Sequence, residues 1–179
     1  FIEYEENVYL GYRYYETVSA TGGSFSVFGQ DGKTYDDAVQ VPFGFGLSYG
    51  TDFSQTITSF DDSGDEIVMT VRVANNGSVA GKDVVQVYHN PPYTDFDIQN
   101  RIEKPTANLV EFSKTGEIAP GAYEDVTLTF AKEDMASYCY TRQNPDGTTG
   151  AYVLESGDYE ISVNKNSHER YDVRTTTVS

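Results

Sequence analysis

The carboxylates are the residues of this sequence most able to do chemistry, since the chain holds 28 Asp and Glu. Two carboxyl groups held about 5–5.5 Å apart can act as nucleophile and general acid in the hydrolysis of an acetal. The adjacent pairs Asp61-Asp62 and Asp65-Glu66 lie in one segment with Ser63 and Gly64, which is typical of a turn. Carboxylates on a turn are solvated and keep ordinary pKa values, the wrong state for a general acid. We therefore assign no catalytic residue.

The other groups that bind metals or act as nucleophiles are sparse. Residues 61–66 offer oxygen ligands at a density that suits calcium, but they lack the spacing of a twelve-residue calcium loop, so we interpret them as a charged hairpin turn. His89 and His168 are too far apart for a metal-binding spacing, and we expect each to be a surface or packing residue. Cys139 is the only cysteine, which excludes an intrachain disulfide and favours a small buried hydrophobe. The glycosylation sequon Asn76-Gly77-Ser78 is explained by its position in a turn. No metal or cofactor is predicted.

The net charge of the chain limits the classes of partner that it can bind. With 12 Lys and Arg against 28 Asp and Glu, the formal net charge is −16. Such a chain repels the phosphates of nucleic acid and of anionic lipid, so we predict neither a nucleic-acid nor a membrane partner, whereas neutral sugars stay compatible. The sequence contains no run of 18 or more apolar residues, so we predict no transmembrane helix. The first residues lack both a Met and the pattern of a signal peptide, so we expect a fragment, and secretion and a cytoplasmic location both stay open.

The segment Val41–Tyr49 is the stretch around which the chain is organised. Pro42 fixes the entry of the segment, and Gly44 and Gly46 permit backbone conformations that other residues avoid. We predict a buried connector whose aromatic side chains pack on both sides. It divides the chain into residues 1–50 and residues 51–179.

Before this connector the pattern is mixed. Tyrosine and valine spacings of three and four predict a short helix across about residues 5–16. Within it, Arg13 can stack on a ring or pair with a carboxylate of a partner domain, and the alternative is a surface arginine. Residues 18–40 are polar, and we expect a loop or a small protruding hairpin with a turn at residues 30–33.

After the connector the apolar period becomes two, which predicts an antiparallel β-sandwich of about eight or nine short strands. The expected strands cover residues 53–60, 67–74, 82–90, 109–115, 126–130, 137–142, 150–155, 159–163 and 171–178. A short helical bridge is expected at residues 132–136 and a long aromatic loop at residues 91–106. Tyr159 stands two residues after Gly157, as in a tyrosine corner, so we predict that its hydroxyl bonds a backbone group a few residues upstream. The fold class is mainly β.

Several of these segments, in order, resemble glycoside hydrolase family 3, which includes β-glucosidases and β-xylosidases. Residues 4–16 and Pro42–Tyr49 resemble the C-terminal edge of its α/β sandwich domain. The chain from residue 51 onward resembles the fibronectin type III-like domain of that family. Its landmarks are residues 76–88, Glu103-Lys104-Pro105, residues 109–115 and Pro120-Gly121.

The resemblance implies a retaining glycosidase as the parent enzyme, with a β-linked glycoside as substrate. In the family, an aspartate nucleophile lies on an N-terminal barrel and a glutamate acid/base comes from the α/β sandwich domain. Neither surrounding motif is matched here, so the resemblance implies a non-catalytic fragment that is inactive alone. Residues 1–50 are then the tail of the α/β sandwich domain with the connector, and residues 51–179 are the fibronectin type III-like domain. The implied partners are the barrel and α/β sandwich domains of the parent.

Two groups of side chains are assigned roles on this basis. Aromatic and basic residues of the N-terminal part are predicted to form the interdomain joint: Tyr12, Arg13, Tyr14, Phe43, Phe45 and Tyr49. Left exposed, such residues make an adhesive patch, so residues 1–50 are expected either to fold back on the sandwich or to cause self-association.

In the loop, Tyr93, Phe96 and Arg101 are candidates for contact with substrate at the active-site mouth, and the alternative is that they cover the end of the sandwich or dock a neighbouring domain. Two other readings of the whole chain stay open: a carbohydrate-binding module, against which the absence of Trp argues, and a structural spacer domain.

Overall fold

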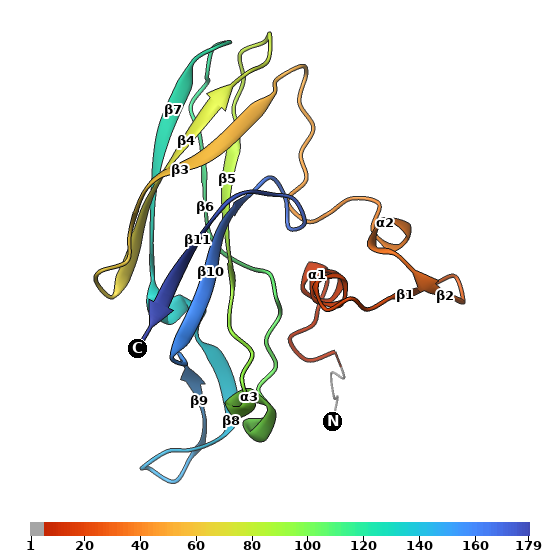
Figure 1. Cartoon of the computed structure of the whole chain (residues 1–179), viewed down its shortest axis with the longest axis vertical. Coiled ribbons are helices and arrows are strands. Elements are labelled where there is room, and N and C mark those ends of the chain that lie inside the picture. The colour runs from red at the N-terminus through yellow and green to blue at the C-terminus, as the bar shows by residue number, and fades with distance from the viewer. Residues whose placement is uncertain (1–5) are drawn as a thin grey trace.

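The computed structural model describes residues 6–179 and shows an antiparallel β-sandwich with a separate N-terminal segment packed against it (Figure 1). One sheet has the order β3-β4-β7 and the other the order β11-β10-β5-β6, and every pairing is antiparallel. The strands of the first sheet are β3 (Phe53–Asp61), β4 (Glu66–Asn75) and β7 (Tyr123–Ala131). The strands of the second are β5 (Val84–Asn90), β6 (Asn108–Lys114), β10 (Gly157–Asn164) and β11 (Arg170–Val178). The mainly β fold predicted from the sequence is confirmed.

Alternation along the strands builds one core between the two sheets. In β4, Ile67, Met69, Val71 and Val73 are fully buried, while Arg72 on the opposite face is exposed. Strand β4 lies between β3 and β7, so its inward side chains meet apolar partners from both neighbours and from the facing sheet. Because side chains alternate between faces with a period of two, the apolar spacing in the sequence sets this register.

A hairpin, β8 (Ser137–Gln143) with β9 (Thr149–Val153), forms its own two-stranded sheet and extends beyond the end of the sandwich (Figure 1). The one-turn 3₁₀ helix η1 (Lys132–Met135) leads into it, where the sequence predicted a short helical bridge. The segment of residues 91–106, predicted to be a loop, contains a helix, α3 (Asp95–Asn100). This helix forms because Thr94 and Asp97 make a capping box that satisfies the free N–H groups of its first turn.

The N-terminal segment holds a helix, a small hairpin and one further helical turn. The helix α1 runs over Tyr12–Ala20 and not over residues 5–16, because Gly11 has a φ of 56° and the right-handed helix begins only after it. The small hairpin, β1 (Phe25–Val27) with β2 (Gln30–Lys33), is present, but its turn lies at Phe28-Gly29 and residues 30–33 are strand. The single turn α2 (Tyr35–Ala38) follows.

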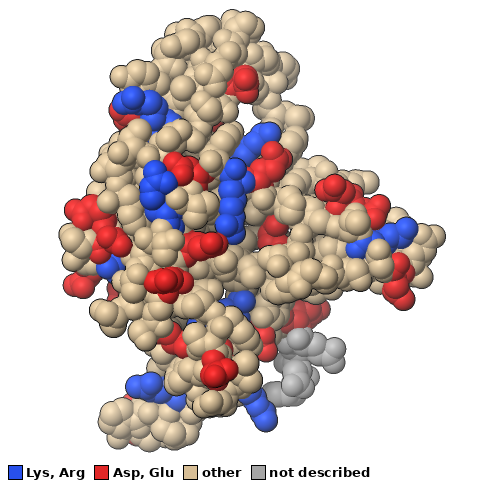
Figure 2. Space-filling model, viewed as in Figure 1, with Lys and Arg blue, Asp and Glu red and all other residues tan. Residues whose placement is uncertain are grey.

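Acidic and basic side chains are interspersed over the visible face and do not form one continuous patch (Figure 2). Among residues 6–179, no helix is long and apolar enough to cross a bilayer.

Candidate functional site: the joint and the segment of residues 91–106

The connector Val41–Tyr49 is attached to the sandwich through its backbone. The Gln86 side chain donates to the Gly44 carbonyl oxygen at 3.0 Å, and the Ser167 N–H donates to the Phe43 carbonyl oxygen at 2.8 Å. Only glycine fits at position 44, where φ is 81° and an added Cβ would overlap the Gln86 Oε1. The connector is thus anchored along its first half.

The side chains of this connector are not buried, contrary to the prediction. Phe43 and Phe45 are 48% and 44% exposed, and Leu47 and Tyr49 are almost fully exposed. The anchoring contacts involve the backbone, and the remaining chain described by the structure offers no second layer for these side chains. Their outer faces are therefore open to another protein surface.

Tyr12 is the predicted joint residue with the most contacts. Its ring stacks on Phe43 with a centroid distance of 4.5 Å and meets Tyr88 edge-on at 6.2 Å. Its hydroxyl accepts a hydrogen bond from the Leu109 N–H at 3.1 Å. Tyr88 is 2% exposed, although it lies on the outer face of strand β5, because α1 and the connector cover that face. Burial raises the pKa of the Tyr88 hydroxyl.

Glu16 is the centre of a buried polar cluster between α1 and the turn that joins β10 to β11. Its carboxylate is 6% exposed and accepts from the Tyr35 hydroxyl at 2.5 Å and the Ser167 hydroxyl at 2.8 Å, and it lies 2.8 Å from the His168 Nδ1. The Tyr35 ring stacks on His168 at 3.8 Å. Burial, followed by the hydrogen bond to Glu16, raises the pKa of Tyr35.

This cluster has a structural and not a nucleophilic geometry. The Ser167 hydroxyl donates to the carboxylate and is not bonded to the histidine, so no base is placed to activate it. Sequence reasoning missed the cluster because Glu16 and His168 are 152 residues apart and no local pattern marks either residue. What the cluster does is fix the N-terminal segment to the sandwich.

The remaining joint residues lie on the same segment. Arg13 is half-buried, and its Nε has no hydrogen-bond partner among the residues that the structure describes. Tyr14 is 44% exposed and meets Tyr15 and Phe25 edge-on. Pairing of Arg13 with a carboxylate of another domain stays a prediction. Tyr4, part of the sequence pattern at this end, lies outside the described residues.

A groove of about 660 Å³ runs between α1, the β1–β2 hairpin, α2 and the connector. Its lining is mostly aromatic and aliphatic, with Tyr12, Tyr15, Phe28, Val41 and Phe43 among its residues. Phe28 is fully exposed at its rim. The groove continues the apolar surface of the connector.

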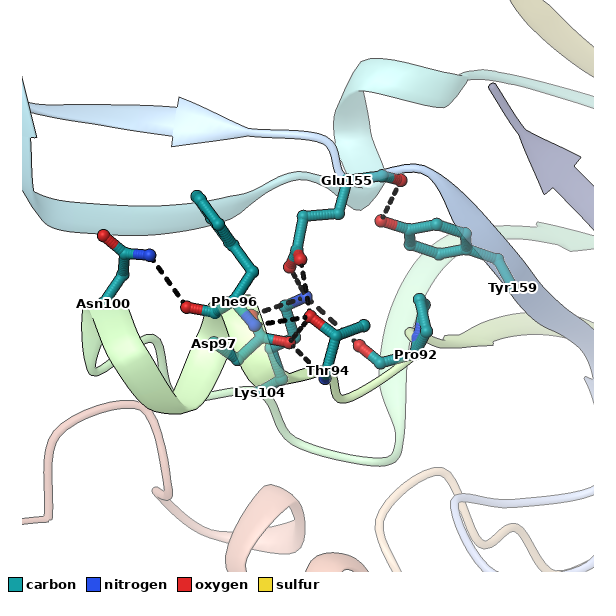
Figure 3. Close-up of polar contacts among 8 residues, drawn as sticks. All are labelled: Pro92, Thr94, Phe96, Asp97, Asn100, Lys104, Glu155 and Tyr159. Atoms are coloured by element: carbon teal, nitrogen blue, oxygen red, sulfur yellow. Dashed lines mark hydrogen bonds and ion pairs between the residues drawn. The ribbon is translucent and has the colours of Figure 1, made fainter.

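In the segment of residues 91–106, a buried ionic cluster holds α3 in place (Figure 3). The Lys104 ammonium is 2% exposed, lies 2.8 Å from the Asp97 Oδ1, pairs with the Glu155 carboxylate and donates to the Pro92 carbonyl oxygen at 3.1 Å. Burial alone would raise the pKa of Asp97, but the Lys104 ammonium and the hydrogen bond from the Thr94 N–H hold it below its usual value. We call Asp97, Lys104 and Glu155 the lysine clamp.

The clamp is not a catalytic pair of carboxylates. The Asp97 side chain is fully buried, the Glu155 side chain is 10% exposed, and both face the same ammonium. No solvent-facing carboxylate pair results, and a substrate has no access to either group.

The structure places the three predicted substrate-contact residues at the surface without bringing them together on a cavity. Tyr93 is 57% exposed and Phe96 37% exposed. Arg101 ends α3 in a left-handed conformation with φ of 54° and is exposed. Their contact with substrate stays a prediction.

Tyr159 connects the clamp to the sandwich. Its hydroxyl donates to the Glu155 carbonyl oxygen at 3.2 Å, four residues upstream, so the hydrogen bond predicted for a tyrosine corner is present (Figure 3). Burial raises the pKa of Tyr159 to about 12. The backbone of Glu155 is thus held by β10 while its carboxylate holds Lys104.

The other side chains that could bind a metal do not lie close together in the part of the chain that the structure describes. Among residues 6–179, no group of three or more His, Cys, Asp or Glu side chains is arranged to hold a metal. Asp61 accepts hydrogen bonds from the N–H and the hydroxyl of Ser63, which lower its pKa in an exposed turn. Cys139 is 1% exposed and His89 is 8% exposed. Burial, reinforced by the charge of Arg13, lowers the pKa of His89 to about 4.

Comparison with known proteins gives one consistent result. The family profile described as "Fibronectin type III-like domain" matches residues 83–167. The β-glucosidase A of Butyrivibrio fibrisolvens is 32% identical over 175 residues, covering 90% of this chain and 18% of that protein. The structure of β-glucosidase 3B from Thermotoga neapolitana in complex with glucose matches with a TM-score of 0.69 and 30% identity, over 98% of this chain and 20% of that chain.

A GH3 β-glucosidase from Bifidobacterium adolescentis matches with a TM-score of 0.70 and 26% identity, over 97% of this chain and 21% of its own. The chain therefore spans about a fifth of the length of the relatives that it matches.

Proposed function

Because this chain is homologous to the C-terminal, fibronectin type III-like region of family 3 β-glucosidases, we propose that it is a non-catalytic part of such an enzyme that braces the catalytic domains. The observation that carries the proposal is the two-sided character of residues 6–50. One side of this segment is fixed to the sandwich and the other presents apolar side chains outward.

The fixed side is held by contacts that a flexible tail would not make. Glu16 binds Ser167 and His168, the Tyr12 hydroxyl accepts from the Leu109 N–H, and the Thr17 hydroxyl accepts from the Thr106 N–H at 3.1 Å. Each ordered residue costs roughly 1–2 kcal/mol of backbone entropy, so several such contacts are needed to hold the segment. These contacts disfavour the spacer reading, in which residues 1–50 would be dispensable.

The outward side has the composition of a protein interface. Its exposed large hydrophobic side chains are Leu10, Tyr14, Phe28, Val41, Phe43, Phe45, Leu47 and Tyr49. Eight exposed apolar side chains within residues 10–49 of a chain of net charge −16 favour a protein partner over solvent. In the proposal the partner is the remainder of the same enzyme, which accounts for the other four fifths of the length of its relatives.

The proposal assigns residues 1–50 to the end of the α/β sandwich domain with its connector, and residues 51–179 to the bracing domain. The catalytic carboxylates then belong to the other domains, with a β-linked glycoside as their substrate. The lysine clamp supports a further part of the proposal, since it holds the exposed Tyr93 and Phe96 on an anchored segment. In the proposal this segment lies at the active-site mouth of the complete enzyme. Tyr93→Ala with Phe96→Ala in a complete enzyme should change the preference between long and short substrates, and unchanged kinetics would contradict substrate contact.

A chimera tests the bracing role. The matching C-terminal region of the Thermotoga neapolitana enzyme is replaced by this chain, and the same enzyme without that region is the control. We expect the chimera to hydrolyse an aryl β-glucoside and to melt at a higher temperature than the truncated enzyme. Phe43→Ser with Phe45→Ser in the chimera should remove most of that gain, while the exposed sandwich variant Phe112→Ser should not.

The isolated chain supplies the second half of the test. It should show no turnover of the aryl β-glucoside above buffer. Turnover that a single carboxylate substitution abolishes, or a truncated enzyme as stable and active as the chimera, would overturn the proposal.

A further inference from the structure

Three tyrosines lie on one face of the β8–β9 hairpin, which extends from the end of the sandwich (Figure 1). Tyr138, Tyr140 and Tyr152 are 51%, 48% and 75% exposed, whereas Cys139 on the opposite face is 1% exposed. Tyr138 stands directly opposite Tyr152 in the strand pairing, and Tyr140 follows two residues along. Since side chains alternate along a strand, the Tyr138 and Tyr152 rings share the solvent side of the hairpin. The strand pairing shifts register after Cys139, but the Cys139 Sγ lies 3.4 Å from the Thr141 hydroxyl oxygen, so these two side chains lie on one side of β8 and Tyr140 lies on the other side with Tyr138.

The hairpin is built to hold these rings in place. The Tyr138 and Tyr152 rings pack edge-on with a centroid distance of 5.3 Å and an interplanar angle of 67°. Gly150 has a φ of 96°, and an added Cβ would overlap the Tyr138 hydroxyl oxygen. Glycine at this position therefore lets the Tyr138 ring lie across the neighbouring strand, and any other residue would displace it.

The α3 segment contacts the hairpin near both of its strands. The Thr141 hydroxyl donates to the Asn100 carbonyl oxygen at the end of α3 at 3.3 Å. Glu155, two residues after β9, belongs to the lysine clamp that holds the start of α3. Figure 3 shows the Phe96 ring extending from α3 toward the hairpin. A surface that is ordered before binding loses less entropy when it takes a ligand.

The composition of this face differs from that of the joint. Every exposed large hydrophobic side chain of the hairpin is a tyrosine, whereas the joint exposes leucine, valine and phenylalanine in addition to Tyr14 and Tyr49. A tyrosine combines an apolar ring with a polar hydroxyl, which suits a ligand that is itself apolar on its faces and polar at its edges. A sugar ring has this character. The net charge of −16 further disfavours anionic ligands.

We propose that the face formed by Tyr138, Tyr140 and Tyr152 binds a neutral β-linked glucan oligosaccharide, with the tyrosine rings against the sugar faces. The choice of a β-linked glucan rests on the proposed function, because it is the polymer of the glycosides that such an enzyme would meet. The face contains no catalytic group, so it would retain a chain of sugars without cleaving it.

The isolated chain can be tested directly by nuclear magnetic resonance titration with two probes, a β-1,4-linked and a β-1,3-linked glucose tetramer. We expect saturable shifts of signals from residues 137–153 with at least one probe. Tyr152→Ala should weaken binding at least fivefold, Tyr152→Phe should weaken it less, and the triple alanine variant should show no saturable shift. Tyr49→Ala, a fully exposed tyrosine of the joint, is the matched control and should bind as the unaltered chain does.

The outcomes separate this proposal from its alternatives. Since the three side chains are about half exposed or more, the variants should keep the urea unfolding midpoint of the unaltered chain, which shows that any loss is not unfolding. No saturable shift with either probe, or binding retained by the triple variant, overturns the proposal. A change in sedimentation of the tyrosine variants without sugar binding would show a protein-docking face and would also overturn it. The chimera experiment does not depend on these tyrosines, so failure here leaves the bracing role intact.

Discussion

Removal of the Lys104 ammonium, the buried cation of the lysine clamp, should strongly destabilise this molecule. Lys104→Met keeps a chain of similar length but removes the partner of Asp97 at 2.8 Å, the partner of Glu155, and the donor to the Pro92 carbonyl oxygen at 3.1 Å. Breaking a buried ion pair on one side costs about 3–5 kcal/mol, because the other charge remains buried without compensation. Two carboxylates are left here, so we expect the upper part of that range.

This cost is large against a total stability of roughly 5–15 kcal/mol for a domain. For a chain of this length, about 2–4 °C of melting temperature corresponds to each kcal/mol, so a loss in the upper part of that range should lower the melting temperature by roughly 8–20 °C. The loss of stability in Lys104→Met should also depend on pH. In the unaltered chain the depressed pKa of Asp97 stabilises the fold above the ordinary value of 3.8, and that stabilisation is lost as the pH falls through the lower folded value. In the variant the unpaired carboxylates gain protons more readily, so the deficit should be smaller at pH 4.5 than at pH 7.

Urea unfolding at both pH values measures the effect. Lys82→Met, at an exposed lysine, is the control and should change the free energy of unfolding by less than about 0.5 kcal/mol. Adding Asp97→Asn and Glu155→Gln to Lys104→Met should restore most of the loss, since the uncompensated charges are then gone. A Lys104→Met deficit below about 1 kcal/mol, or one that neutral carboxylate replacements do not reduce, would refute the clamp as a buried ionic anchor.

Three other substitutions test buried polar groups elsewhere in the molecule. Tyr159→Phe removes the hydrogen bond to the Glu155 carbonyl oxygen and should lower stability by about 1 kcal/mol with an unchanged circular dichroism spectrum; an unaltered melting temperature would contradict this. Glu16→Ala leaves the Tyr35 hydroxyl buried without its acceptor and should cost about 1–3 kcal/mol and speed proteolysis within residues 6–40, whereas equal digestion of both chains would argue against its anchoring role. His89 is held neutral with a pKa of about 4 against 6.5 when unfolded, so the fold should lose up to about 3 kcal/mol as the pH falls from 6.5 to 4. His89→Gln should flatten that slope in urea titrations, and an identical slope in the variant would refute it.

Much of the sandwich was accessible from local sequence because its determinants are local. The alternation of Ile67, Met69, Val71 and Val73 with polar residues specifies both a strand and its buried face. The turn residues between such runs divide them into separate strands. The Gly157-x-Tyr159 pattern likewise predicted the hydrogen bond from the Tyr159 hydroxyl to the Glu155 carbonyl oxygen, because donor and acceptor are only four residues apart.

The errors arose where one residue or one distant contact overrode the local pattern. Gly11 stops a helix that the tyrosine spacing extended toward the N-terminus. The capping box of Thr94 and Asp97 starts a helix in a segment predicted to be a loop, although its spacing was visible in the sequence. The connector was expected to be buried from its aromatic content alone, but burial depends on what lies opposite.

By itself, then, the sequence determined the positions of the strands, which of their faces point inward, and the resemblance of the chain to glycoside hydrolase family 3. Each of these depends on residues close together in the sequence or on short patterns in a fixed order. Only the tertiary structure decided which charged residues are buried together, because Glu16 meets His168 and Lys104 meets Glu155 across long separations. It also decided that Tyr138, Tyr140 and Tyr152 share one exposed face while the joint keeps its phenylalanines outward. Burial is a property of the packed chain, and no single segment carries it.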